Sequence, residues 1–149
     1  MSHVPTRRQT LVLAALSAGA TESFAPVQVQ KMFFLIDENI SAELGGKQFE
    51  FEPYDYGPFD KNVYTELNIL QGMGLVYLSY VSPTAGGRRY SVTNSGRAIG
   101  QGTLDSLSPG AHKFIIDVAD WVRKLTFAQL VGSIYKAFPH MREKSIFID

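Results

Sequence analysis

Apolar residues recur at helical spacing in residues 60–74, and this is the clearest pattern in the chain. Val63, Leu67 and Leu70 fall at positions i, i+4 and i+7, so a helix would carry all three on one face. Gly74 follows, and glycine readily takes the positive φ at which many helices end. The pattern therefore predicts an amphipathic helix with an apolar face toward a core and a polar face left free.

The residues just before this helix predict how it begins. Pro58 fixes its own φ and pushes Gly57 out of the helical region, so the chain turns tightly here. Asp60 is a suitable N-cap, because its carboxylate can accept from the free amides of the first turn. Phe59 and Tyr64 then have the spacing of a hydrophobic staple, which favours the same helix start.

A two-stranded hairpin is predicted after the helix. Leu75–Val81 and Arg88–Val92 have the composition of strands, and the loop Ser82–Gly87 between them contains proline and glycine. A helix followed by such a hairpin is the order of the recognition helix and wing in winged helix-turn-helix proteins. This order predicts two adjoining surfaces for double-stranded DNA, a helix for a groove and a wing for the backbone.

Helical patterns flank this central part. The further helices are expected at about Thr6–Ala18, at Pro26–Ile36, after a cap at Thr93, after Ser108-Pro109 and after a cap at Thr126. Phe49 and Phe51 alternate with acids, which suggests a short strand or extended segment. Residues 100–110 are rich in glycine and serine and are interpreted as a linker. The predicted fold class is α+β, mostly α, with a winged-helix core at residues 1–100 and a C-terminal helical hairpin at 101–149 packed on it.

Composition narrows the classes of function. The 149 residues include no cysteine, which excludes disulfides, thiolate metal sites and cysteine nucleophiles. The formal net charge is zero, so the chain has no overall attraction for nucleic acid. His3, His112 and His140 are far apart in sequence and lack metal-ligand spacing, and no nucleotide-binding or nucleophile motif occurs. We expect neither an enzyme nor a cofactor nor a metal site.

The N-terminal segment has two interpretations. Arg7-Arg8 followed by the apolar run Leu11–Leu16 imitates a signal peptide, even of the twin-arginine type. A first core helix is the alternative, and we favour it because the later apolar stripes would otherwise lack cover. No apolar run reaches the length of a membrane span. We therefore expect a cytoplasmic protein without membrane contact.

Charge is distributed unevenly, and this motivates the candidate DNA contacts. Between Asp37 and Asp60 there are seven acids and one lysine, whereas residues 61–100 carry four bases and one acid. The candidates are polar or basic side chains of the outer helix face and the wing: Lys61, Asn62, Thr65, Asn68, Arg88 and Arg89. Lysine and arginine suit phosphates, and threonine and asparagine can contact base edges. An ordinary solvated polar face is the alternative interpretation of each.

A protein partner is the competing hypothesis for the same region. The acidic segment 37–60 would repel a phosphate backbone, and Glu50 and Glu52 are expected to share a strand face that receives a basic partner. Ile69 falls on the outer face of the helix, where an apolar residue more often marks a protein contact.

Several motifs resemble a broad prokaryotic group of winged-helix proteins. They are Tyr56-Gly57-Pro58-Phe59, Val63-Tyr64-x-x-Leu67-x-x-Leu70, Gly74-Leu75-Val76 and Tyr90-x-Val92-Thr93-x-x-Gly96. The Tyr-Gly-Pro element also resembles the SocA-like, or Panacea, antitoxin domain, and the match covers residues 6–100. This resemblance implies either DNA-binding regulation or neutralisation of a partner toxin.

The preferred hypothesis is a winged-helix DNA-binding protein that regulates transcription. The C-terminal aromatic residues, Trp121 among them, are interpreted as core or as the interface of a homodimer. The alternative is a winged-helix protein-interaction module, antitoxin-like or an accessory of phage defence.

Overall fold

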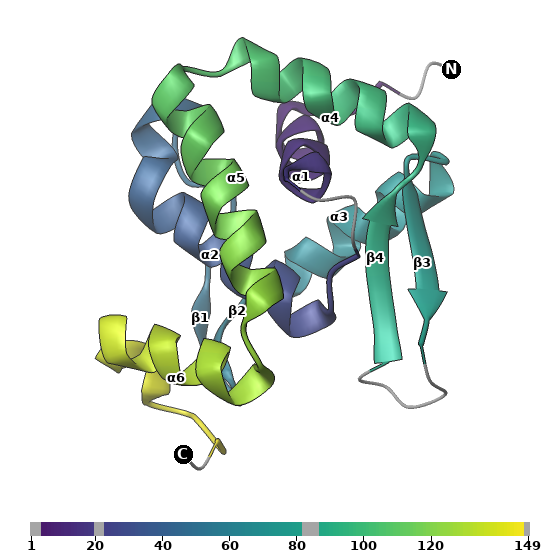
Figure 1. The fold of residues 1–149 in the computed structure, drawn as a ribbon. Helices are drawn as coiled ribbons and strands as arrows, with labels where there is room; N and C mark the ends of the chain where they lie inside the picture. The colour runs from purple at the N-terminus through teal and green to yellow at the C-terminus, as the bar shows by residue number, and fades with distance from the viewer. Residues whose placement is uncertain (1–3, 20–22, 82–86, 148–149) are drawn as a thin grey trace.

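The computed structural model describes residues 4–19, 23–81 and 87–147, and within these it contains six α-helices and two two-stranded antiparallel sheets (Figure 1). The helices are α1 (Arg7–Ser17), α2 (Pro26–Ile40), α3 (Lys61–Gly72), α4 (Asn94–Ser106), α5 (Pro109–Lys124) and α6 (Phe127–Ala137), with short 3₁₀ helices η1 (Ser41–Leu44) and η3 (Pro139–Arg142). The strands are β1 (Glu52–Tyr54), β2 (Gly57–Phe59), β3 (Val76–Tyr80) and β4 (Arg88–Val92). The fold class is α+β with mostly helical content, as predicted.

Helix α1 lies at the centre of the molecule, beneath α4 in Figure 1. Every residue from Leu11 to Leu16 is buried, so the run that imitates a signal peptide forms part of the core. Thr6 caps the helix, because its hydroxyl accepts from the Gln9 amide at 3.2 Å while the Gln9 side chain accepts from the Thr6 amide at 2.9 Å. The predicted first core helix is confirmed.

The predicted linker at residues 100–110 is wrong, because α4 continues to Ser106 and α5 begins at Pro109. Gly100 is buried where α4 crosses α1, and a Cβ at this position would lie 2.5 Å from the Leu13 carbonyl oxygen. Glycine here allows two helices to approach closely. Glycine is favoured both in loops and where two helices pack closely. The glycine-rich composition of residues 100–110 was therefore wrongly interpreted as a linker.

The predicted hairpin after α3 is confirmed. Strands β3 and β4 pair antiparallel, with Leu78 opposite Tyr90. Most of the predicted loop Ser82–Gly87 lies outside the described residues. Phe24 adds a third short segment that the sequence did not indicate, because its amide and carbonyl each exchange a 2.8 Å hydrogen bond with Tyr90. The order of helix and hairpin matches the expectation, and membership of the winged-helix class stays a prediction.

The segment expected as a simple tight turn is a second hairpin, β1–β2. Its turn is formed by Asp55 and Tyr56, and Gly57 follows with a φ of 102°, which side-chain-bearing residues rarely adopt. Phe49 and Phe51 precede this strand pair and are not part of it. Helices α2 and α3 are thus separated by a hairpin, whereas a helix-turn-helix motif joins its helices by a short turn.

The C-terminal helices do not form the expected hairpin along a common interface. Helix α5 packs against α2 and α1, whereas α6 packs against α2, β2 and η3. Figure 1 shows α6 turning away from the axis of α5. Buried residues of both helices, among them Ile115 and Ile134, belong to the same core as α1, α2 and α3. The described part of the C-terminal region, residues 101–147, therefore contributes to the same core as α3.

Candidate interaction surface

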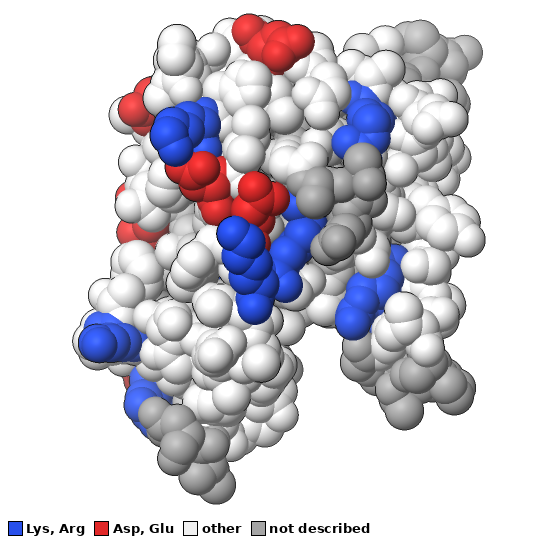
Figure 2. All heavy atoms as spheres, in the orientation of Figure 1, with Lys and Arg blue, Asp and Glu red and all other residues white. Residues whose placement is uncertain are grey.

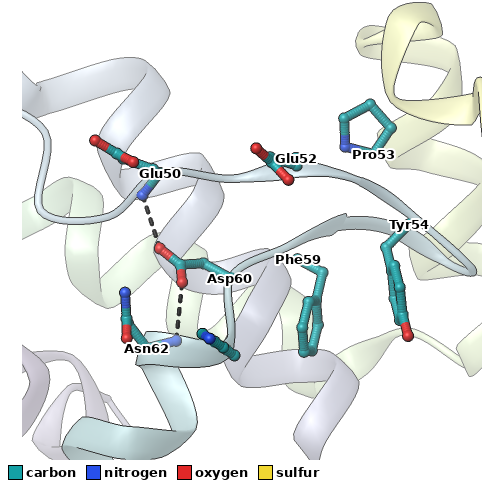
Figure 3. A pocket seen from close by; sticks show the side chains of 8 residues that line it. Glu50, Glu52, Pro53, Tyr54, Phe59, Asp60 and Asn62 are labelled. Atoms are coloured by element: carbon teal, nitrogen blue, oxygen red, sulfur yellow. Dashed lines mark hydrogen bonds between the residues drawn. The ribbon is translucent and has the colours of Figure 1, made fainter.

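Helix α3 begins at a hydrogen-bonded junction that fixes the orientation of its exposed face. The Asp60 carboxylate accepts from the backbone amides of Asn62 and Glu50, each at 2.8 Å (Figure 3). Gln30 of α2 holds Asp60 from the inside, because its side chain accepts from the Asp60 amide and donates to the Asp60 carbonyl, both at 3.0 Å. The predicted N-cap is confirmed, and it also ties α3 to α2 and to the segment before β1.

Aromatic side chains pack around this junction. The ring centroids of Phe59 and Tyr64 lie 5.8 Å apart, which confirms the predicted contact across the helix start. Tyr54 of β1 stacks on Phe59 with a centroid distance of 4.9 Å and an interplanar angle of 26°. Tyr54 remains 52% exposed, so this Tyr54–Phe59 stack presents an aromatic surface to solvent.

The outer face of α3 is open, as expected. Its apolar stripe is buried, and the residues predicted to contact DNA on this helix are all exposed: Lys61, Asn62, Thr65 and Asn68. Ile69 is 44% exposed on the same face. Glu66, the acid of this helix, points inward, where it accepts from Arg8 at 2.7 Å and from Gln9 at 3.3 Å. Lys61 is therefore the charged side chain on the outer face.

A pocket of about 350 Å³ lies beside the N-terminal end of α3, and it is mainly acidic. Three carboxylates and one ammonium group line it, from Glu50, Glu52, Asp60 and Lys61. Figure 3 shows Glu50 and Glu52 along one edge of this pocket and the Tyr54–Phe59 stack at its end. Asp60 is used for capping, whereas Glu50 and Glu52 are exposed. We call this site the α3 corner.

The two wing arginines, Arg88 and Arg89, lie on opposite faces of the β3–β4 hairpin, because successive residues of a strand point to opposite faces. Arg88 shares the face of buried Tyr90, and its guanidinium carbon lies 5.6 Å from the ring centroid of Tyr64. Arg89 donates to the carbonyl of Arg88 at 3.2 Å. Both arginines are half-buried, so neither is a freely extended wing contact.

Basic side chains are dispersed on the face of the molecule drawn in Figure 2. They occur there as separate groups, with acidic side chains between some of them. The same face is hollowed between a lobe containing α6 and a lobe containing the β3–β4 hairpin. The described residues form no continuous basic strip across this view.

The acidic segment 37–60 has mixed roles. Asp37 is buried and accepts from the amides of Gln48 and Phe49 at 3.0 and 2.9 Å. Burial raises the pKa of Asp37, and the two amide donors partly oppose this shift. Glu38 pairs with Lys47 at 3.4 Å. Of the other acids in this segment, Glu43, Glu50 and Glu52 are exposed, and Glu50 and Glu52 lie together at the α3 corner. Glu50 does not lie on the strand face expected for it.

Sequence reasoning missed the buried lysine of α2. Lys31 is 3% exposed, and its ammonium donates to the Pro58 carbonyl at 3.3 Å. Burial lowers the pKa of Lys31 from 10.5 to about 7. The sequence contained one indication of this burial. The apolar run Met32–Ile36 marks a helix that is buried nearly all round, and Lys31 directly precedes it.

Comparison with known proteins adds no assignment. No protein-family model matches the sequence, and no curated protein matches it significantly. Among the described residues, no three His, Asp or Glu side chains lie close enough together to hold a metal ion. Nor does any helix in the described parts of the chain have both the length and the apolar character required to cross a bilayer.

Proposed function

We propose that this chain is a protein-interaction module that binds a basic segment of a partner protein at the α3 corner. The supporting observation is the chemistry of that pocket, in which the exposed carboxylates of Glu50 and Glu52 stand beside the Tyr54–Phe59 stack. An arginine of the partner fits this combination, because a guanidinium pairs with carboxylates and also packs on aromatic faces. Tyrosine is enriched at protein interfaces for related reasons.

Charge explains why a protein partner is placed before DNA. A phosphate approaching the start of α3 would meet Glu50 and Glu52 as well as Lys61. The predicted DNA-contacting set contains three cations, so counterion release would give a slope of at most about −3 in a plot of log affinity against log salt. Such a surface binds DNA weakly unless several copies act together.

DNA binding by a winged-helix regulator is the second candidate, and the open outer face of α3 favours it. Within the described residues, no hydrogen bond occupies the side chains of Lys61, Asn62 or Asn68. Free amide and ammonium groups on one helix face can contact base edges and phosphates. Arg88 lies on the hairpin face that is directed toward Tyr64 of α3.

One double variant separates the two candidates because it changes binding in opposite directions. Glu50→Lys/Glu52→Lys is tested against a fluorescein-labelled arginine-rich peptide and against a labelled DNA duplex of random sequence, both at low salt. The proposal expects wild type to bind the peptide, the variant to lose it, and DNA binding by wild type to be weak or absent. The DNA candidate expects no peptide binding and stronger DNA binding by the variant.

The control carries the same change in net charge at a distant position. Asp105→Lys/Glu143→Lys alters exposed acids of α4 and of the turn after η3. Loss of peptide binding in both double variants would reduce the effect to net charge and contradict a local site. Loss in the α3-corner variant alone supports the proposal.

Two further expectations accompany this proposal. We propose a cytoplasmic location, which the incorporation of the apolar N-terminal run into α1 supports. A homodimer through the C-terminal helices stays a prediction, and the partial exposure of Trp121 (37%) and Phe127 (43%) is compatible with it.

A further inference from the structure

A second pocket lies on the other side of the Tyr54–Phe59 stack, between α2 and the β1–β2 hairpin. It has a volume of about 260 Å³. Gln30 and Lys31 of α2 line it, and four of its ten lining residues are aromatic: Tyr54, Tyr56, Phe59 and Tyr64. Pockets for drug-sized ligands span about 300 to 1,000 Å³, so this one suits a molecule built on a single ring.

Lys31 supplies the unusual polar feature of this pocket. An ammonium group has three donors, and the Pro58 carbonyl at 3.3 Å takes one of them. No carboxylate among the described residues forms an ion pair with Lys31. A buried cation without a counter-charge is unfavourable, and an anion entering the pocket would supply both the charge and the missing acceptors.

The fold holds the lysine stem firmly in place. Gly57 packs directly against it, because a Cβ at this position would lie 3.6 Å from Lys31 Cε and 3.3 Å from a ring carbon of Tyr135. The Pro58 carbonyl that accepts from Lys31 is two residues before Asp60, the cap of α3. The pocket is thus built on the same rigid segment that starts α3.

We propose that this pocket binds a small aromatic monocarboxylate, with the ring between the tyrosine and phenylalanine side chains and the carboxylate on the Lys31 ammonium. Aromatic side chains in the lining favour a ring, and a volume of about 260 Å³ accommodates one. Asp55 lines the pocket rim, and its carboxylate disfavours a ligand with a second negative charge. This inference does not depend on the function proposed for the α3 corner.

Benzoate is the first probe, with benzamide as its uncharged analogue and acetate as the ligand without a ring. Isothermal titration and thermal unfolding of the intact chain should show benzoate binding at least about tenfold more tightly than either analogue, the scale of one hydrogen bond to a charged group. Equal binding of benzoate and benzamide would overturn the role of Lys31. Absence of binding by benzoate, phenylacetate and 4-hydroxybenzoate would overturn the proposal as a whole.

Lys31→Met tests the cation directly, because methionine keeps an unbranched stem of similar size. We expect benzoate affinity to fall about tenfold or more, while Lys136→Met, at an exposed lysine of α6, leaves it unchanged. Unchanged benzoate affinity in Lys31→Met contradicts the proposal. If that variant does not fold, the comparison of benzoate with benzamide on wild type decides the same question.

The pH dependence gives an independent readout. Benzoate affinity should decrease as the pH rises through about 7, because Lys31 then loses its proton. The ionisable groups that face Lys31 are Asp55, Tyr54, Tyr56 and Tyr64 around the pocket and Tyr135 behind Gly57. Asp55→Asn should strengthen benzoate binding and keep the same pH dependence. A dependence that persists in Lys31→Met would contradict the assignment to this lysine.

Discussion

Tyr54 and Phe59 separate two pockets of similar size, about 350 and about 260 Å³, whose charged groups differ in sign and in exposure. On one side, Glu50 and Glu52 are exposed to solvent. On the other, Lys31 is buried against the Pro58 carbonyl. Exposed carboxylates remain charged at little cost, whereas a buried ammonium is destabilised by loss of hydration. The two pockets therefore differ in the solvation of their charged groups as well as in the sign of the charge.

The same contrast in exposure distinguishes the two lysines that line these pockets, Lys61 and Lys31. Lys61 is exposed at the start of α3 and contributes a solvated charge that salt screens. Lys31 is inside, and its pKa is lowered to about 7 by burial. The buried lysine therefore responds to pH near neutrality, and it should dominate the pH dependence of stability in this part of the molecule.

The largest expected effect is on the pH dependence of stability, through Lys31→Met. The folded pKa of about 7 lies below the unfolded value of 10.5, so between these values the unfolded chain binds the extra proton and wild-type stability rises with pH. The slope is at most about 1.4 kcal/mol per pH unit. Lys31→Met should be more stable at pH 7 by a few kcal/mol, up to about 4, and should lack this rise.

Urea unfolding of both proteins across this pH window measures the effect. Lys136→Met, at an exposed lysine, should keep the wild-type profile. If Lys31→Met and wild type showed the same dependence of stability on pH, the claim that burial lowers the pKa of Lys31 would be wrong.

Gly57→Ala is expected to destabilise the β2 segment that lines the second pocket. The φ of 102° is strained for any residue with a side chain, and the new Cβ would lie 3.3 Å from the Tyr135 ring. We expect a loss of about 3 kcal/mol in the free energy of unfolding. Gly102→Ala in α4 is the matched control, because open space surrounds that position and the change should be neutral or stabilising. Equal stabilities of the two variants would contradict the role assigned to Gly57.

Asp60→Ala removes the carboxylate of the junction that ties α3 to α2 and to the segment before β1. Two backbone amides, of Asn62 and Glu50, lose their acceptor. Loss of the cap and of the second bond should cost about 2 kcal/mol. Asp60→Asn keeps one acceptor oxygen and should lose about half as much. Denaturant unfolding distinguishes the series, and a neutral Asp60→Ala would show that the junction does not hold α3.

Local rules predicted the elements of this fold better than their contacts. The cap at Asp60 and the stripe of Val63, Leu67 and Leu70 depend on neighbours within one helical turn, so the sequence contains all that is required to identify them. Gly100 was misread because its close approach to α1 depends on a residue far away in sequence. Lys31 was missed for the same reason, since it is buried and its ammonium contacts the Pro58 carbonyl of β2, 27 residues further along the chain.

In the candidate site, too, features that depend on sequence neighbours were predicted better than features that depend on distant contacts. Exposure of the outer α3 face was predictable from helical periodicity, and it is confirmed for Lys61 and Asn68. The separation of Arg88 from Arg89 follows from strand alternation, yet their joint use was expected because they are adjacent in sequence. The exposure of each acid could be determined only from the tertiary structure. Asp37, for example, is buried and accepts from the amides of Gln48 and Phe49, which lie more than ten residues away in sequence.

The smallest expected effect concerns the open pocket. Glu50→Gln/Glu52→Gln should change the free energy of unfolding by no more than about 0.5 kcal/mol, because both side chains are exposed and a glutamine is almost the same size. If the α3 corner is a site for a basic partner, this variant should nevertheless bind an arginine-rich peptide more weakly than wild type. Thermal unfolding and peptide titration of the same sample measure both quantities. A large loss of stability without loss of peptide binding would contradict the proposed site. The carboxylates of Glu50 and Glu52 would then stabilise the fold, and other groups would bind the peptide.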